Sequence, residues 1–505
     1  MSAGTLAARF WSNVLEIPDQ PAFALCEPGK ALTYRTWHEI GSLVHRWLQF
    51  FRAEIPGAVQ SANITTWLEN SLHWIAIDLA CQTLGIVHVA LDRREPLIRA
   101  RELATLANSA IFISEPVVEP TVSPLNAAEW LCKAQSVHPR SPAQMLATSG
   151  TAGSSKLVVL SHTNLLSNAI AKLDAAPQYP SDLRLNILPF AHAYARTCEL
   201  STWILSRSRL AIAGNWDDWL EQAGELRPTL VNLVPYLAEL ATDALAADAP
   251  KALGGKLRLL QVGGAALSDE LWQQLSAQGL PPLQGYGLTE ASPVVCSNRT
   301  GSQRPGVIGP AVQDVELRID EDGVLWTRGP HVMLEYWRSP ELTEGAIRDG
   351  WLCTGDLVEP TGHGMRVLGR VSQQIVLSTG YKVCPEAVEA KLRTHPWIEQ
   401  AVVVGDKRKH ISALVWPRLH AIPADFFRAE TREEPRELRN LETARWLTAI
   451  VNYCSRFNDL PSYAIPRDIR VLPSPMRVED GTLTRKGTPN RNYWLNFIES
   501  PETPD

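Results

Sequence analysis

A loop rich in hydroxyl side chains and glycine ends in a lysine near residue 150. Residues 146–156 read LATSGTAGSSK and follow a run that is typical of a strand. Glycine backbone N–H groups can converge on an anion, hydroxyl groups add donors, and a lysine adds a point charge. The segment is not a Walker A loop, because Leu157 follows the lysine. A plain surface loop has the same composition. As a phosphate site, the loop would use Thr148, Ser149, Gly150, Thr151 and Lys156.

A second segment, residues 284–290, combines an aromatic ring, two glycines, a hydroxyl and a carboxylate in the order QGYGLTE. Tyr286 can stack on a purine, and glycine on either side allows a ligand to approach the backbone. Thr289 can donate to a phosphate, and Glu290 offers the hard oxygen ligands that Mg²⁺ prefers. An ordinary turn before a helix, with Glu290 near the helix N-terminus, is the alternative interpretation. The glycines are Gly285 and Gly287.

A third and a fourth feature follow further along the chain. Residues 350–356 read GWLCTGD, so that Asp356 follows a glycine, and Arg370 follows Gly369. The carboxylate of Asp356 can accept both hydroxyls of a ribose, and Arg370 can reach a ribose or a phosphate. Taken singly, each is also an ordinary turn feature. The order of these features along the chain favours the interpretation that they bind one nucleotide.

Strands that alternate with helices must position these segments. Residues 229–234 form an apolar, β-rich run before a helical stretch from Pro235, and residues 257–262 lead to Gly263-Gly264 and a helix from Ser268. This alternation predicts parallel sheets covered by helices, and glycine-rich turns at strand ends are where such sheets bind ligands. Short alternating runs between residues 314 and 336 predict a small antiparallel unit. We therefore expect an α/β fold.

The pattern changes in the C-terminal part of the chain, where residues 374–404 predict a strand, a helix and a second strand. We place the domain boundary near residue 370. The prediction is a large N-terminal domain, residues 1–369, of mostly parallel sheets covered by helices with the small antiparallel β unit. A smaller α+β domain, residues 370–505, follows it.

Composition excludes several classes. With 48 Lys+Arg against 54 Asp+Glu the net charge is −6, so no basic surface for nucleic acid is expected. The eight cysteines form no C-x-x-C pair, which argues against a zinc site or a disulfide framework. The N-terminus lacks a basic stretch before an apolar run, and residues 74–91 read as a helix running into a strand. We expect a cytoplasmic protein without a membrane span.

Together and in order, these segments resemble the adenylate-forming superfamily of acyl-CoA synthetases, adenylation domains and luciferases. The resemblance covers nearly the whole chain. Within it, residues 188–198, LPFAHAYARTC, look like the L-P-L-x-H-x-x-E-R-T segment of the long-chain fatty acyl-CoA synthetase branch, with Ala195 where that branch has Glu. The motifs that carry the resemblance are residues 148–156, Gly263-Gly264-Ala265, residues 285–290, residues 350–356, Gly369-Arg370 and residues 380–383.

The resemblance implies an enzyme that uses ATP, Mg²⁺ and CoA. A carboxylic acid, here a medium- or long-chain fatty acid, attacks the α-phosphorus of ATP, and the resulting acyl-AMP then passes its acyl group to a thiol. Thr289 and Glu290 would act in catalysis, Glu290 as the metal ligand, and His192 would lie near the acyl group unless it is a packed core histidine. The C-terminal domain would rotate about residues 370–372. The thiol path would include His192, Gly287, Gly380 and Tyr381.

One motif departs from the family. Residues 483–491 read LTRKGTPNR, and alignment to L-T-x-N-G-K-x-x-R puts Thr488 where the family has its adenylation lysine. Lys486 lies two residues earlier and is our candidate for that role. Two alternatives stay open. One is a ligase that loads an acyl carrier protein, and the other is a binding module that has lost adenylation. The charge-dense stretch 428–445 is a solvated face or a peripheral contact with a carrier or a membrane.

Overall fold

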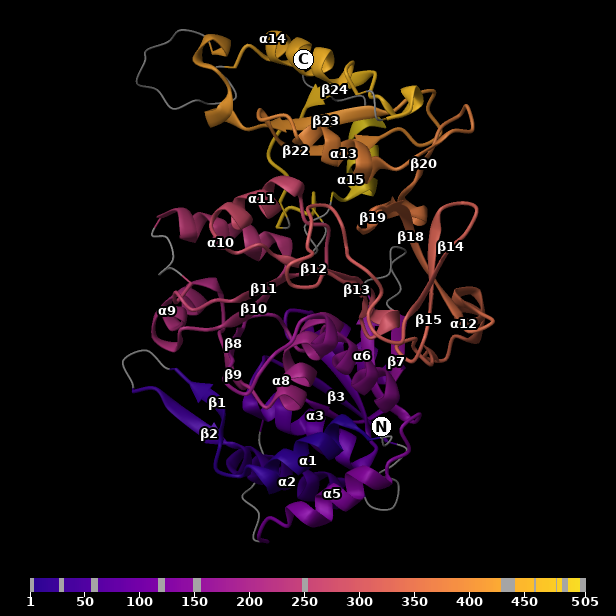
Figure 1. Ribbon diagram of the computed structural model, residues 1–505. Helices are drawn as coiled ribbons and strands as arrows, with labels where there is room; N and C mark the ends of the chain where they lie inside the picture. The colour runs from indigo at the N-terminus through magenta and orange to yellow at the C-terminus, as the bar shows by residue number, and fades with distance from the viewer. Residues whose placement is uncertain are drawn as a thin grey trace. The chain divides into compact units, whose positions relative to one another are not determined.

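The computed structural model describes most of the chain, and its strands and helices follow the predicted alternation (Figure 1). The chain divides into two compact units. The larger comprises Met1–Ile319, Trp326–Thr354 and Pro360–Met365, and the smaller Asp320–Leu325, Gly355–Glu359 and Arg366–Asp505. The described residues are 4–26, 31–55, 62–116, 123–148, 156–247, 253–427, 441–457, 460–477, 479–483 and 489–499.

An eight-stranded sheet with strand order β13-β12-β11-β10-β8-β9-β1-β2 lies in the larger unit. Its central neighbours are parallel, whereas β13 and β2 pair antiparallel at the two edges. Parallel central strands that are buried along their length confirm the predicted α/β class. In sheet order the strands are β13 (Val294–Ser297), β12 (Leu283–Gly287), β11 (Leu259–Val262), β10 (Leu230–Leu233), β8 (Leu183–Asn186), β9 (Arg209–Ile212), β1 (Pro21–Leu25) and β2 (Thr33–Thr36).

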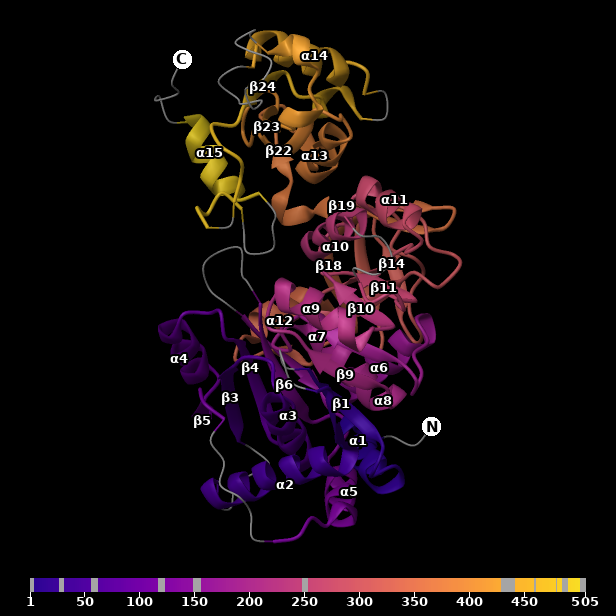
Figure 2. The same cartoon turned by 90° about the vertical axis from the view of Figure 1, so that its left-hand side faces the viewer.

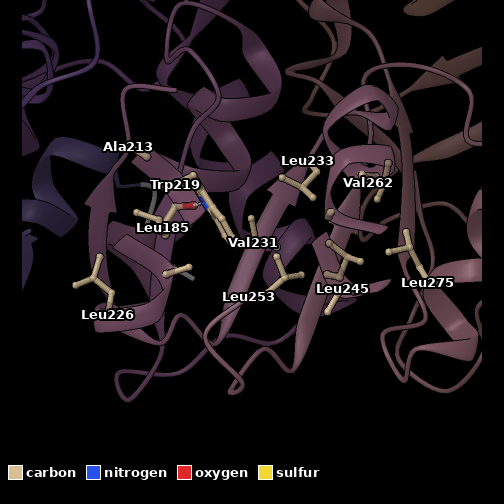
Figure 3. Close-up of a cluster of buried hydrophobic side chains, with 14 of the residues drawn as sticks. Leu185, Ala213, Trp219, Leu226, Val231, Leu233, Leu245, Leu253, Val262 and Leu275 are labelled. Carbon is tan, nitrogen blue, oxygen red and sulfur yellow. Dashed lines mark hydrogen bonds between the residues drawn. The ribbon is translucent and has the colours of Figure 1, made fainter. Parts of the chain in front are cut away.

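Helices α9 (Trp216–Leu226), α10 (Pro235–Ala247) and α11 (Asp269–Ala277) cover one face of this sheet. Figure 3 shows their apolar side chains against those of β8, β10 and β11. Trp219 is buried there, and its Nε1 donates to the Leu185 carbonyl at 2.9 Å. Each fully buried large side chain stabilises the fold by about 1.5–3 kcal/mol. The predicted helix after Gly264 begins as expected, because the Ser268 side chain accepts from the Leu271 backbone N–H.

A six-stranded sheet, with order β16-β7-β6-β4-β3-β5, forms the other large layer of this unit. Pairs β3/β4, β3/β5 and β4/β6 are parallel, whereas β6/β7 and β7/β16 are antiparallel. The strands are β16 (Glu335–Tyr336), β7 (Lys156–Ser161), β6 (Pro142–Thr148), β4 (Val87–Asp92), β3 (Asn63–Leu68) and β5 (Ser109–Ile113).

Helix α3 (Leu72–Leu84) is buried from Trp74 to Leu84 and packs among α1, α2 and α5 beside this sheet (Figure 2). Gly85 ends it with a left-handed φ of 76°, which favours glycine, and β4 follows. The predicted helix running into a strand is thus confirmed, and within the described residues no helix is long and apolar enough to cross a bilayer. The remaining helices here are α1 (Leu6–Glu16), α2 (Trp37–Glu54), α4 (Leu97–Leu106), α5 (Ala127–Ser136), α6 (His162–Ala175), α7 (Ala193–Ala195) and α8 (Thr202–Ser206).

Short strands between residues 316 and 370 form a five-stranded sheet of order β14-β15-β18-β17, with β19 beside β18. The predicted short strands appear as β14 and β15, and β17 pairs antiparallel with β18. The elements are β14 (Glu316–Ile319), β15 (Val324–Arg328), α12 (Pro340–Ala346), β17 (Ile347–Arg348), β18 (Trp351–Thr361) and β19 (Gly364–Arg370).

The smaller unit is α+β, as predicted, and has its own core around the buried Trp446 and Val403. Strand order β22-β23-β24 combines an antiparallel and a parallel pair. Most of the charge-dense stretch, residues 428–440, lies outside the described residues. The elements are β20 (Ile375–Val376), β21 (Lys382–Val383), α13 (Pro385–Arg393), β22 (Ile398–Val404), β23 (Ser412–Pro417), α14 (Thr443–Cys454), β24 (Asp468–Val471) and α15 (Arg491–Glu499).

Candidate active site

The carboxyl ends of β10, β11 and β12 bring two of the predicted segments to one edge of the eight-stranded sheet. Val262 of β11 pairs with Gln284 of the parallel strand β12, so Gly263, directly after β11, follows beside Gly285 of β12. Gly264, with φ of 84°, and Ala265 lie in the turn after β11. Ligands of open α/β sheets bind at such an edge. The structure therefore places the glycine-rich turn next to the 285–290 segment.

Lys156, Glu290 and Tyr336 meet beside the end of β12. Lys156 Nζ lies 4.9 Å from the centroid of the Tyr336 ring, which is within the range of a cation–π contact. The Tyr336 hydroxyl donates to Glu290 Oε1 at 2.8 Å. Thr289 immediately precedes the carboxylate in a short 3₁₀ turn. Two predicted residues more than a hundred positions apart thus share one aromatic partner.

Strand pairing brings Lys156 and Tyr336 together. In β16, Tyr336 pairs with Val158 of β7, whose first residue is Lys156. The Met333 backbone N–H also donates to the Glu290 carbonyl at 2.8 Å, which ties the segment before β16 to the 3₁₀ turn. Tyr336 was missed at the sequence level, because nothing local to residue 336 marks it.

The donor set fits a magnesium ion that is shared with a substrate. Glu290 is half-buried and offers a carboxylate, while the described residues contain no group of three or more His, Cys, Asp or Glu that could hold a metal alone. Mg²⁺ is usually bound by one or two carboxylates together with substrate phosphates and water. A single carboxylate at the carboxyl edge of a parallel sheet is compatible with that mode.

Thr148, at the end of β6, pairs with Lys156, at the start of β7, so the two ends of the hydroxyl-rich loop lie side by side. The Thr148 hydroxyl lies 3.5 Å from the Lys156 carbonyl oxygen. Ser149, Gly150 and Thr151 are outside the described residues. Of the two described ends, Lys156 is the one that contacts Tyr336.

Gly287 is required by a close backbone approach. The Leu288 N–H donates to the Pro293 carbonyl at 3.0 Å, and a Cβ added at Gly287 would lie 1.8 Å from that oxygen. Tyr286, on the same strand, pairs with Cys296 of β13. The close approach accounts for the second glycine of the segment by packing, whatever its part in a thiol path.

Replacing Gly287 by alanine is therefore expected to destabilise the protein by about 1–3 kcal/mol or more, because the backbone must shift to relieve the overlap. Gly285→Ala is the matched control, since its nearest neighbour would be the Cys296 carbonyl at 3.9 Å. The midpoints of urea unfolding of the two variants measure the difference. Equal midpoints would show that the 287–293 turn adapts freely.

His192 is half-exposed rather than packed in a core. Its Nε2 lies 2.9 Å from Asp92 Oδ2, at the end of β4, and the His192 side chain is 55% exposed. Arg94 Nη2 lies 2.6 Å from the same oxygen. Burial tends to raise the pKa of Asp92, but hydrogen bonds from His192 and Arg94 hold this pKa well below its usual range. Asp92 was missed, although a carboxylate at the end of a buried strand is a signal that could have found it.

Tyr194, two residues after His192, reaches the turn after β11. A Cβ added at Gly263 would lie 3.1 Å from Tyr194 Cζ, and the Tyr194 hydroxyl donates to Asn232 Oδ1 at 3.4 Å. The ring is half-buried. Tyr194 belongs to the LPFAHAYARTC motif, but no local pattern of residues indicates its contact with the turn after β11.

A buried ion pair anchors the segment that carries these residues. Arg196 Nη2 lies 2.6 Å from Asp78 Oδ2 of α3, and His88 Nδ1 lies 2.9 Å from Asp78 Oδ1. Arg196 begins a π-helix, Arg196–Ser201, and its Nη1 donates to Ser201 Oγ at 2.9 Å. Burial tends to raise the pKa of Asp78, but the Arg196 charge and the contacts of His88 and Gln82 together lower this pKa. The segment is thereby joined to α3 and β4.

A second buried pair joins the same π-helix to β8 and predicts a pH effect. Arg184 Nη1 is 3.8 Å from Glu199 Oε2, and both side chains are fully buried. Burial raises the pKa of Glu199 from 4.5 to about 7, although Arg184 opposes the rise. The folded state thus holds a proton that the unfolded state has released. The stability from this group is complete below about pH 4.5 and is lost as the pH rises through about 7.

Glu199→Gln removes this titration and is expected to lessen the loss of stability between pH 5 and pH 8. Urea midpoints of the variant and the parent at both pH values measure it, and other titrating groups cancel in the comparison. A parent that loses no more stability than the variant over this range would contradict the raised pKa.

The other described candidate site residues lie in the smaller unit. Arg370 Nε donates to the buried Asp356 at 2.9 Å. Tyr381 stacks on Tyr463, with ring centroids 4.4 Å apart, and Gly380 before it has φ of 86°. Asp356 and Arg370 are therefore neighbours, as two groups that bind one ribose would have to be. Lys486 and Thr488 lie outside the described residues.

Comparisons with known proteins give the family. Residues 10–337 match the model of the AMP-binding enzyme, and residues 372–438 match that of the AMP-binding enzyme C-terminal domain. A long-chain-fatty-acid–CoA ligase of Mycobacterium bovis, FadD15, is 30% identical over 71% of this chain and 69% of its own. The mitochondrial malonate–CoA ligase ACSF3 of Bos taurus is 23% identical over 94% of this chain and 89% of its own.

The fold agrees with these matches. The O-succinylbenzoate coenzyme A synthetase MenE of Bacillus subtilis, in complex with AMP, has a TM-score of 0.74 at 20% identity and covers 96% of this chain and 97% of its own. At that identity the likeness establishes the fold. The matched residues include Lys156, Glu290 and Tyr336. The chain therefore belongs to the AMP-binding enzyme family of acid–thiol ligases.

Proposed function

We propose that this chain activates a carboxylic acid with ATP to form acyl-AMP and then transfers the acyl group to CoA. The observation that carries the proposal is the contact of Lys156 and Glu290 with Tyr336 at the carboxyl edge of β11 and β12. A cation and a carboxylate at one edge suit a polyphosphate with its metal ion. The curated relatives, which are CoA ligases, support the thiol acceptor.

A carboxylate is a poor electrophile, so it must first attack the α-phosphorus of ATP and displace pyrophosphate. Negative charge grows on phosphate oxygens during this step, and positioned cations stabilise it. Lys156 and the hydroxyl groups of Thr148, Ser149 and Thr151 would hold the phosphates, and Glu290 would hold Mg²⁺. When bound, Mg²⁺ neutralises and orients the phosphate oxygens. Thr289 would donate to the α-phosphate.

Of the remaining candidate residues, some would bind the nucleotide and others would line the path of the thiol. Tyr286 would stack on the adenine, with Gly263, Gly264 and Ala265 along its edge, while Asp356 and Arg370 would bind the ribose. The thiol would pass His192, Gly287, Gly380 and Tyr381. We further propose residues 1–369 and 370–505 as the functional domains, with a hinge at 370–372. Lys486 would take the place of the family lysine.

The acid is proposed to be a medium- or long-chain fatty acid. The support is the LPFAHAYARTC segment and the 30% identity to a long-chain-fatty-acid–CoA ligase. Malonate and O-succinylbenzoate appear in the names of other matches, so the acid panel must include dicarboxylic and aromatic acids. A cytoplasmic location is part of the proposal and is supported by eight free cysteines.

Acid-dependent ATP/pyrophosphate exchange with Mg²⁺, across acids from acetate to oleate plus malonate, benzoate and amino acids, tests the proposal. Exchange that peaks for one class followed by CoA-dependent release of AMP is the expected result. Exchange without CoA turnover, but with acylation of a carrier protein, would favour the carrier-loading alternative. ATP binding without exchange for any acid would favour the binding module, for which Thr488 in place of the family lysine is the specific observation.

A further inference from the structure

We propose that Glu386 is a positioning residue for the reaction, because its carboxylate supports the backbone before Arg370 and so fixes the arginine that would bind the ribose of ATP. The inference rests on the proposed function and deepens it. It begins from one contact within the smaller unit. A Cβ added at Gly369 would lie 2.6 Å from Glu386 Oε2 and 3.2 Å from Glu386 Cδ. The carboxylate thus occupies the space that a side chain at residue 369 would need.

Helix α13 presents this carboxylate in its first turn, because Glu386 is its second residue. The same end of the helix contacts the chain beyond Arg370. There, Gln374 Nε2 donates to Sγ of Cys384, the residue before the helix, at 3.7 Å. Since Gly369 and Gln374 lie on either side of Arg370, the start of α13 supports the backbone both before and after the arginine.

The Glu386 side chain is itself held in place. Arg491 Nη2, at the start of α15, lies 3.2 Å from Glu386 Oε1, and both oxygens of this carboxylate are shielded from solvent. Arg491 is fixed in turn, since its Nη2 also donates to Glu389 Oε2 at 3.0 Å and its Nη1 donates to the Val403 carbonyl at 3.2 Å. The Glu386 carboxylate is therefore a rigid support.

Arg370 is the group that this support orients. Its Nε donates to Asp356 at 2.9 Å, and its side chain is 46% exposed, whereas that of Asp356 is 5% exposed. An exposed arginine has many rotamers, so its direction depends on its backbone as well as on its partner. A misplacement of about 1 Å can cost about 10²-fold in rate. The contact at Gly369 thus sets how well Arg370 and Asp356 fit one ribose.

The test measures kcat/KM in acid-dependent exchange with ATP, 2′-deoxyATP and 3′-deoxyATP. Glu386→Ala removes the support and is expected to lower the preference for ATP over the deoxynucleotides by about 10- to 100-fold. Glu386→Gln keeps the length of the side chain and should keep this preference. Glu386→Asp keeps the charge but is shorter, so it should weaken the preference, and it carries the test if Glu386→Ala does not fold.

Two comparisons separate positioning from a general loss of stability. Glu389→Gln perturbs the same arginine, Arg491, but has no contact at Gly369. It should leave the nucleotide preference unchanged even where it lowers the midpoint of urea unfolding. Arg370→Ala should lose the preference by itself, and adding Glu386→Ala should cause no further loss, since Glu386 acts through Arg370.

The outcomes distinguish this inference from the proposed function. Parental nucleotide preference in folded, active Glu386→Ala would overturn the role of Glu386. An equal loss in Glu389→Gln, or a further loss in the double variant, would overturn it as well. Absence of exchange in the parent with every acid would instead overturn the proposed function, and this inference with it.

Discussion

Replacing Glu290 by glutamine is expected to lower acid-dependent ATP/pyrophosphate exchange by about 10²- to 10³-fold. The amide has nearly the shape of the carboxylate and can still accept from the Tyr336 hydroxyl, which lies 2.8 Å away. It lacks the charge that would hold Mg²⁺ against the phosphates. The loss should therefore appear in kcat and in the Mg²⁺ dependence, whereas the midpoint of thermal unfolding stays close to that of the parent.

Two controls sharpen this result. Glu335→Gln changes an exposed carboxylate on the same strand as Tyr336 and should leave exchange unchanged. Tyr336→Phe removes one hydrogen bond to a charged group, worth about 1.5–3 kcal/mol, and should cost less than the loss of the charge itself. Glu290→Gln with parental exchange would exclude Glu290 as the metal ligand. An equal loss in Glu335→Gln would point to a general effect of charge at this edge.

Arg196→Ala is expected to destabilise the larger unit by about 3–5 kcal/mol, because it leaves the carboxylate of Asp78 buried without its cation. Both side chains are almost completely buried, at 0% and 1% exposure. His88 and Gln82 still contact the carboxylate but bring no fixed charge. Unfolding by urea, followed through tryptophan fluorescence, measures the change.

The matched control is Arg299→Ala, which breaks an ion pair with Asp174 on the surface of the same unit. Those side chains are 42% and 47% exposed, so the expected change is at most about 1 kcal/mol. Asp78→Asn with Arg196→Met, which removes both charges, should be less destabilising than Arg196→Ala alone. Equal effects of the buried and exposed single variants would refute the anchoring role of Arg196.

The local sequence was sufficient to predict the helices and strands, and also those candidate residues that are close together along the chain. Apolar β-rich runs, glycine turns and the Ser268 cap predicted β10, β11 and the helices after them, because each depends on contacts between near neighbours. The family resemblance added the order of the motifs, including the 285–290 segment. Strand order could not be predicted in the same way, since pairing joins residues that are far apart in the chain.

The sequence by itself determined the α/β class, the family and a set of candidate groups, since these depend on residue types and on spacing along the chain. Only the tertiary structure decided which groups meet. Pairing of β16 with β7 brings Tyr336 to Lys156 and Glu290, and the end of β4 brings Asp92 to His192. The Tyr194 ring fills the space beside Gly263 for the same reason. Such contacts arise from long-range packing, which no local pattern of residues encodes.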